Sequence, residues 1–261
     1  MRFLTITLLV FATLAGCRKS ERNNDTDITL IEDVANAQNA LLEVFIAAHE
    51  ANLTTPGIRT FLSGATLTAD TLGSPRSLIV DFGPTWCASP NGRNRCGKII
   101  IYQSGYYTTP GSTSTVYFDS LYVNGFNYSN TFTIVTTSTG YYLKPNNLKI
   151  TAPDSSYSYT LSGNYALTST AGTATVAADD DEFSITGTMT AAGRNGGTGN
   201  CTITASMPLV FKAICGQVVS GQMKIVPNGL AQRTLDFGTG GCDAVATGTL
   251  HGEAVAVNIT F

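Results

Sequence analysis

The stretch Ser114-Thr115-Val116-Tyr117-Phe118-Asp119-Ser120-Leu121-Tyr122-Val123, with Asn124-Gly125 directly after it, is the strongest indication of the fold. Side chains alternate between the two faces of a β-strand. The run is therefore predicted to carry large apolar groups on both faces: Val116, Phe118 and Tyr122 on one, and Tyr117, Leu121 and Val123 on the other. We expect both faces of this strand to be covered. Asn-Gly is the strongest two-residue hairpin signal, which predicts an antiparallel neighbour.

Short β-branched and aromatic runs of this kind continue to the end of the chain, separated by Gly, Asn, Pro and Asp. Asn228-Gly229 gives a second hairpin signal. Turn residues at intervals of about 8–12 residues, without helical patterns between them, favour an antiparallel β-sandwich over residues 58–261, with a barrel as the alternative. The expected strands are 77–82, 98–102, 114–123, 131–137, 148–151, 157–161, 183–190, 202–206, 218–226, 233–237, 244–250 and 254–260.

A short internal echo joins two of these strands. Asp81-Phe82-Gly83 is followed by Cys87 with the same spacing as Cys242 after Asp236-Phe237-Gly238. A duplicated β unit is one interpretation. Protein kinases also carry Asp-Phe-Gly, but this chain lacks their glycine-rich loop and their other catalytic motifs. We expect a structural role, with the phenylalanines in the core and the glycines in turns.

Residues 29–53 are predicted to form one α-helix before the β domain. Apolar residues recur there at steps of three and four, and Thr29 with Glu32 matches a capping box. Pro56-Gly57 marks the stop. We expect this helix to pack on the β domain through one apolar face, and a partner-binding helix is the alternative. The apolar positions are Leu30, Val34, Ala37, Leu41, Val44, Phe45 and Ala48.

The N-terminus has the pattern of an export signal: Arg2, an apolar run over residues 3–13, and then Leu14-Ala15-Gly16-Cys17. It resembles the signal of Gram-negative bacterial lipoproteins, in which such a lipobox precedes the acylated cysteine. The resemblance implies removal of residues 1–16, acylation of Cys17 (palmitate included) and anchoring in a membrane. The polar segment 17–28 then forms a tether, and Arg18 after the cysteine favours the outer membrane. Either its periplasmic or its surface face is compatible with the sequence.

Composition restricts the partners of the chain. The formal net charge is −3, which gives no basic surface for a phosphate backbone and argues against nucleic acid. No apolar stretch after the signal approaches the roughly 20 residues needed to cross a bilayer. The domain is otherwise similar only in its general β-rich composition to envelope lipoproteins, a likeness that implies no activity.

Five cysteines remain besides Cys17, so at least one cannot pair within the chain. We predict disulfides Cys87–Cys96, across a turn-rich loop, and Cys215–Cys242, between two late strands. Thiols outside the cytoplasm tend to pair, although sequence alone does not fix connectivity. A metal site is not expected, because the chain has no C-x-x-C motif and only two histidines, His49 and His251.

The candidate binding residues gather in one loop and one aromatic segment. Trp86, Arg93 and Arg95 lie in the loop 83–98, where an indole with guanidinium groups suits a sugar or a peptide. Tyr106 and Tyr107 lie beside a turn in the tyrosine-rich part of the chain. The leading interpretation is a binding or structural module that contacts a glycan or an envelope protein. The alternatives without a binding function are a hairpin tip for the loop and β propensity for the clustered tyrosines.

Catalysis has little support in the sequence. There is no G-x-S-x-G motif, and no cofactor is predicted. A carbohydrate hydrolase with paired carboxylates remains an alternative, using Asp81, Asp236 or the acids of residues 179–182. That acidic run is otherwise expected to be a solvated turn, with a weak calcium site as a remote option. A fimbrial or adhesin subunit is the third possibility, and would show an exchangeable terminal strand near 254–261.

Overall fold

The computed structural model describes residues 25–53, 60–88 and 92–259. The lipobox with Cys17 lies outside these ranges. One long α-helix is followed by antiparallel strands, with two short 3₁₀ turns. The elements are α2 (Thr29–Leu53), β1 (Thr66–Asp70), β2 (Arg76–Asp81), β3 (Cys87–Ala88), β4 (Asn94–Gln103), β5 (Thr113–Val123), β6 (Phe126–Thr136), β7 (Gly140–Thr151), β8 (Ser158–Ala171), η1 (Ala178–Asp180), β9 (Glu182–Ala192), β10 (Thr198–Ile203), β11 (Leu209–Lys212), η2 (Ala213–Cys215), β12 (Gln217–Pro227), β13 (Arg233–Thr239), β14 (Val245–Leu250) and β15 (Glu253–Asn258).

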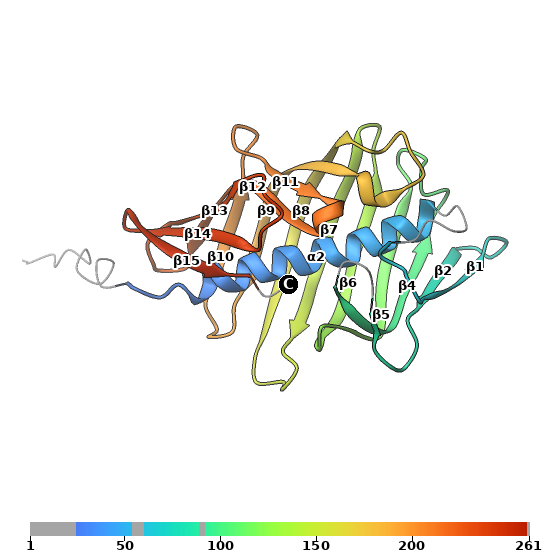
Figure 1. The fold of residues 1–261 in the computed structure, drawn as a ribbon, viewed down its shortest axis with the longest axis horizontal. Coiled ribbons are helices and arrows are strands. Elements are labelled where there is room, and N and C mark those ends of the chain that lie inside the picture. Colours follow the sequence, from blue (N-terminus) through green and yellow to red (C-terminus); the bar gives the residue numbers. More distant parts are fainter. Residues whose placement is uncertain (1–24, 54–59, 89–91, 260–261) are drawn as a thin grey trace, which may run out of the picture.

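All described strands belong to one continuous antiparallel sheet. From β4 to β10 each main strand pairs with the next along the chain, and β1 and β15 are the two edges. The helix α2 crosses the strands on one side of the sheet (Figure 1). It contacts β7 and β8 in the middle of the sheet, and also β2 and β15 near the two ends. The opposing walls expected for a sandwich are therefore parts of one sheet that curls around the helix.

The mainly β class, the antiparallel pairing and the single N-terminal helix are confirmed. The helix begins where the sequence predicts, and the Asp27 carboxylate accepts the N–H of Thr29 at its start. Its environment is different from the one expected, because consecutive residues on every side of α2 are buried. No helix in the described part of the chain is long and apolar enough to span a membrane.

The polar side of α2 is buried together with the apolar side, so its charged groups need partners inside the sheet. Arg95 Nε donates to Glu43 Oε1 over 2.8 Å, and Arg194 Nε donates to Asp33 Oδ1 over 2.6 Å. The helix is thus held by a side chain of β4 and by one from the turn between β9 and β10. Its buried polar residues are Asp33, Asn36, Gln38, Asn39, Glu43, His49 and Glu50.

The side chains of strand β5 do not alternate between its two faces as the sequence predicts. The register against both neighbours shifts around Asp119 and Ser120, and Ser120 has a positive φ of 50°. A bulge of this kind changes the face to which the following side chains point. Leu121 therefore lies inside with Val116, whereas Tyr122 is exposed with Tyr117. The prediction that both faces of this strand are covered is wrong, since its outer face carries exposed tyrosines.

The two Asp-Phe-Gly segments form the same local structure. Asp81 Oδ1 accepts the N–H of Gly83 and Asp236 Oδ1 accepts that of Gly238, both over 2.8 Å. Both glycines have positive φ, +79° and +83°, and both phenylalanines are buried in the core. The predicted burial of the phenylalanines is confirmed. The aspartate closes the turn that ends β2 in the first segment, whereas Gly238 of the second segment lies within β13, where the pairing with β12 shifts register.

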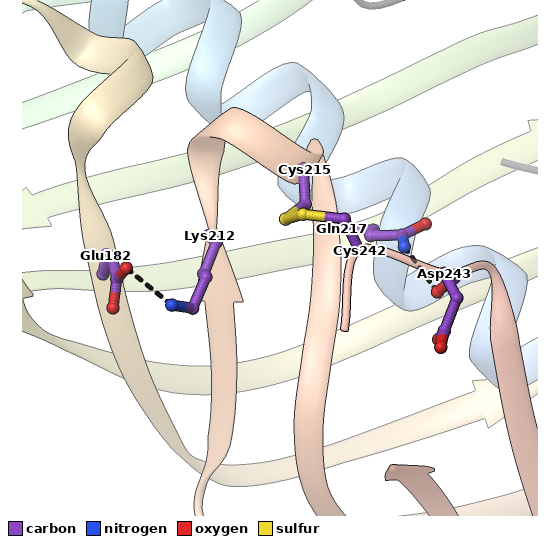
Figure 2. Close-up of a disulfide and its surroundings, with 6 residues drawn as sticks. All are labelled: Glu182, Lys212, Cys215, Gln217, Cys242 and Asp243. Carbon is purple, nitrogen blue, oxygen red and sulfur yellow. Dashed lines mark hydrogen bonds and ion pairs between the residues drawn. A yellow bond between two sulfur atoms is a disulfide. The ribbon is translucent and has the colours of Figure 1, made fainter. Parts of the chain in front are cut away.

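The disulfide Cys215–Cys242 is confirmed, with a Cα–Cα distance of 5.2 Å. It joins η2 to the loop after β13, next to the hydrogen bond from Gln217 to the Asp243 carbonyl (Figure 2). The predicted Cys87–Cys96 bridge is wrong, because Cys96 is a free thiol. The β3–β4 register sets Cys87 opposite Arg95, one residue from the alignment that a cross-strand bridge needs.

Candidate functional site

The loop 83–98 does not present its predicted binding residues together. Trp86 is 54% exposed and its ring meets the edge of Tyr122. Arg95 is only 1% exposed, because it forms the buried ion pair with Glu43 of α2. Arg93 also points inward, with its Nε 3.5 Å from Glu43 Oε2. The expectation that both arginines face a ligand is wrong: a buried carboxylate on the helix draws them into the interior.

Tyr106 and Tyr107 also differ in their environment, since the first is exposed and the second is buried. Tyr106 is exposed, and the Arg76 guanidinium lies 3.9 Å from its ring centroid. Tyr107 is buried, and its hydroxyl lies 2.9 Å from His49 Nδ1. The two side chains therefore point into different environments. The prediction that Tyr107 is a surface binding residue is wrong, because its side chain lies in the interior.

A different pair of tyrosines forms a hollow on the sheet face that points away from α2. Tyr102 of β4 follows the buried Ile101, and Tyr117 of β5 follows the buried Val116, so both tyrosines point outward. Their rings meet edge to face, with centroids 5.7 Å apart. The hollow has a volume of about 400 Å³ and is lined by these two rings and Pro75, Gln103, Ser104, Thr113 and Thr115. We call it the outer tyrosine hollow.

Hydroxyl groups border the two rings. Thr113 donates from its hydroxyl to Ser104 Oγ over 3.0 Å, and its N–H donates to the same oxygen over 2.9 Å. The regular pairing of β4 with β5 aligns Tyr102 with Thr115. The site thus combines two apolar ring surfaces with hydroxyls held by a rigid sheet, and no charged side chain belongs to its described lining.

A second site lies inside, at the C-terminal half of α2. His49 Nε2 lies 2.8 Å from Asp181 Oδ2, and its Nδ1 lies 2.9 Å from the Tyr107 hydroxyl. Both His49 and Asp181 are 1% exposed. Rings pack around the imidazole with centroid distances between 5.2 and 5.9 Å, and they belong to Phe45, Tyr107, Tyr141 and Phe183.

These contacts determine what His49 can do. When neutral, the ring donates from one nitrogen and accepts at the other, so donation to Asp181 leaves Nδ1 to accept the Tyr107 O–H. Neither nitrogen is then left to take a proton from a serine or threonine, which is what a hydrolytic triad requires. Burial raises the pKa of Tyr107 well above its usual value, and that of Tyr141 to about 12. Both phenols therefore stay neutral.

A cavity of about 460 Å³ opens against this histidine and aspartate. Its wall is unusually rich in hydroxyl groups and carries Asp181 as its one carboxylate, with neither lysine nor arginine among the described lining. We call it the hydroxyl pocket. Its lining is His49, Leu53, Thr108, Thr136, Thr137, Ser138, Thr139, Gly140, Tyr141, Thr168, Ser169, Thr173 and Asp181.

The acidic run is not a uniformly solvated turn. Asp181 is buried against His49, Glu182 pairs with Lys212 over 2.8 Å (Figure 2), and Asp179 accepts the Thr60 hydroxyl over 3.0 Å. The expected solvated turn is wrong for Asp181, because η1 turns that residue inward. Within the described ranges, no group of three or more His, Cys, Asp or Glu side chains is placed to hold a metal ion.

The carboxylates considered for hydrolysis are not brought together. Asp81 lies at the end of β2 and pairs with Lys98 over 3.1 Å. Asp236 lies in β13 and accepts a hydrogen bond from Gln222. Strands β4 to β12 separate the two in the sheet, and neither lines any of the pockets described above. Each carboxylate instead belongs to its own turn and its own neighbour.

Protein-family models, curated proteins and solved structures all give no match to this chain. The two sites must therefore be judged on their own geometry. Tyr102 and Tyr117 carried a signal in the clustering of tyrosine in this segment. His49 and Asp181 carried none, because a lone histidine and an acid far away in sequence do not reveal that they meet.

Proposed function

We propose that this protein is a lipid-anchored envelope protein that binds glycans through the outer tyrosine hollow. The observation that carries the proposal is the exposed Tyr102–Tyr117 pair, set in a hydroxyl-lined depression of a rigid sheet. Aromatic side chains offer apolar surface with a polar tip, which matches the alternating C–H and O–H groups of a sugar. Thr115 and Ser104 supply donors and acceptors beside the rings.

The charge of the hollow favours a neutral glycan. Its described lining is uncharged, so an anionic or cationic ligand would gain no ion pair there. Preformed sites lose little conformational entropy on binding, and the two tyrosines stand on paired strands with their rings in contact. An envelope protein is the other partner suggested by the sequence, and it would need a larger apolar area than this hollow offers.

Affinity electrophoresis in gels that contain soluble neutral or acidic polysaccharides tests this function. We expect at least one neutral polysaccharide to retard the purified protein. The variants Tyr102→Ala and Tyr117→Ala should lose the retardation, whereas Tyr142→Ala should keep it. Tyr142 is an exposed tyrosine of the same sheet outside the hollow. Retardation by none of the polysaccharides, or equal retardation of all three variants, would contradict the proposal.

The anchor rests on the lipobox and on the polar tether before α2. Two or more acyl chains hold a protein at a membrane stably. Metabolic labelling of expressing Gram-negative cells with an alkyne fatty acid should label the wild-type protein, and Cys17→Ser should remain unlabelled and leave the membrane fraction. Labelling of the Cys17→Ser variant would contradict acylation at this residue.

A further inference from the structure

Asp181, which lines the hydroxyl pocket, carries a buried carboxylate oxygen with no partner among the described residues. Asp181 Oδ2 binds His49, but Oδ1 has no hydrogen-bond partner among the described residues. A buried acceptor left without a donor costs about 1–3 kcal/mol, and more when it is charged. Since Asp181 lines the pocket, a ligand donor could supply the missing hydrogen bond.

The charge around Asp181 indicates the sign of that ligand. His49 is the only basic side chain in the described lining, and its Nε2 already contacts the other oxygen of the carboxylate. The neighbouring Asp179 and Asp180 accept hydroxyl donors from Thr60 and Thr175. Glu182 is the one member of this acidic run with a described lysine partner. A cation in the pocket would therefore be attracted, and an anion repelled.

The rest of the lining indicates which other groups a cationic ligand would carry. Hydroxyls of Thr137, Thr139 and Thr168, with others on the same wall, can both donate and accept. The volume of about 460 Å³ is within the range of sites for small molecules. A bare metal ion would require more carboxylates than the pocket has, whereas a small ammonium compound with several hydroxyls matches the whole lining.

We propose that the hydroxyl pocket binds a small polyhydroxylated primary amine, of the amino-sugar class, whose ammonium group donates to Asp181 Oδ1. The Thr and Ser side chains take its hydroxyls, and the ring of Tyr141 covers its apolar face. His49 acts as a positioning residue, because its hydrogen bond fixes the orientation of the carboxylate. This site is separate from the outer tyrosine hollow and does not depend on glycan binding there.

Isothermal titration with a matched pair of ligands tests the assignment. Glucamine and sorbitol share the same polyhydroxylated chain, and only glucamine carries an ammonium group at neutral pH. We expect glucamine to bind the wild-type protein at least about tenfold more tightly than sorbitol, which corresponds to one charge-assisted hydrogen bond. Equal binding of the two ligands, or no heat with glucamine, would overturn the proposal.

Variants locate the site. Asp181→Asn keeps an acceptor for His49 but removes the charge, and should weaken glucamine binding at least about tenfold. The control is Asp154→Asn, which makes the same change at an exposed turn outside the pocket, and should bind as the wild type does. Thr168→Val, which removes one lining hydroxyl, should weaken both ligands in parallel. Circular dichroism verifies that each variant is folded, and undiminished binding by Asp181→Asn would refute the assignment.

Discussion

His49 and Asp181 are 132 residues apart in the chain, yet His49 Nε2 and Asp181 Oδ2 lie 2.8 Å apart in the interior. The histidine comes from the C-terminal half of α2 and the aspartate directly follows the 3₁₀ turn η1. Their contact connects the enclosed helix to the loop between β8 and β9. It also orients the carboxylate that lines the hydroxyl pocket, so one interaction serves both the fold and the site.

Replacing His49 should destabilise the protein strongly. In His49→Asn the shorter side chain leaves the Asp181 carboxylate and the Tyr107 hydroxyl without their partner, and it opens a gap among four aromatic rings. We expect a loss of about 3 kcal/mol in the free energy of unfolding, measured in urea. The control His251→Asn makes the same change in an exposed turn, where asparagine tolerates the positive φ of 55°. Equal losses in the two variants would contradict a buried role for His49.

Sequence periodicity predicted α2 from its apolar positions, such as Leu41 and Phe45, and both are buried. It could not predict that the opposite side of the helix is enclosed too. The partners of that side are distant in sequence: Arg95 is 52 residues from Glu43, and Arg194 is 161 residues from Asp33. Whether a polar helix residue meets water or a buried cation depends on how the sheet curls, which no local pattern records.

At the candidate sites too, some features follow from local sequence patterns and others depend on the tertiary structure. The outward direction of Tyr117 follows from strand alternation, but Tyr122 required knowledge of the bulge at Ser120. The backbone of Gly97 lies close to this bulge, and a Cβ atom at Gly97 would lie 1.9 Å from the Ser120 carbonyl oxygen. The glycine is therefore needed where the two backbones approach closely. A pairing irregularity between two strands is a tertiary property, so strand alternation alone predicts the wrong faces after Asp119.

The buried pair Glu43–Arg95 should contribute far more to the free energy of unfolding than a partly exposed pair does. Glu43→Gln removes the charge that Arg95 and Arg93 face in the interior, and we expect a loss of about 2–4 kcal/mol in unfolding free energy. Glu182→Gln breaks the partly exposed pair with Lys212, and should cost at most about 1 kcal/mol. Urea denaturation of the two matched variants measures the difference. If Glu182→Gln lowered the unfolding free energy as much as Glu43→Gln does, burial would not determine how much an ion pair contributes to stability.

Loss of the disulfide should lower stability through the unfolded chain. Cys215 and Cys242 close a loop with a sequence separation of 27, for which the chain-entropy relation gives about 3.5 kcal/mol. The double variant Cys215→Ser/Cys242→Ser should show this loss in denaturant. Cys96→Ser is the matched control, because Cys96 forms no bridge, and its effect should stay below about 1 kcal/mol. A similar loss from Cys96→Ser would contradict the assigned connectivity.

Glu50 should make stability depend on pH in a direction that its surroundings determine. Its carboxylate accepts the N–H groups of Thr60, Phe61 and Leu62 over 2.6 to 2.9 Å. Burial nevertheless outweighs these bonds and raises the pKa of Glu50 above its ordinary value of 4.5. The folded protein therefore binds this proton more tightly than the unfolded chain does. The resulting stabilisation is complete below the unfolded pKa and is lost as the pH rises through the folded one.

Glu50→Gln removes that titration while the amide oxygen can still accept a backbone N–H. The unfolding free energy of the variant, relative to the wild type, should therefore increase as the pH rises from about 4 to about 6. Urea titrations of both proteins at a series of pH values measure this difference, and contributions from other buried acids such as Asp33 cancel in it. A difference that stays constant, or that falls with pH, would mean that the three N–H donors outweigh burial and hold the carboxylate ionised.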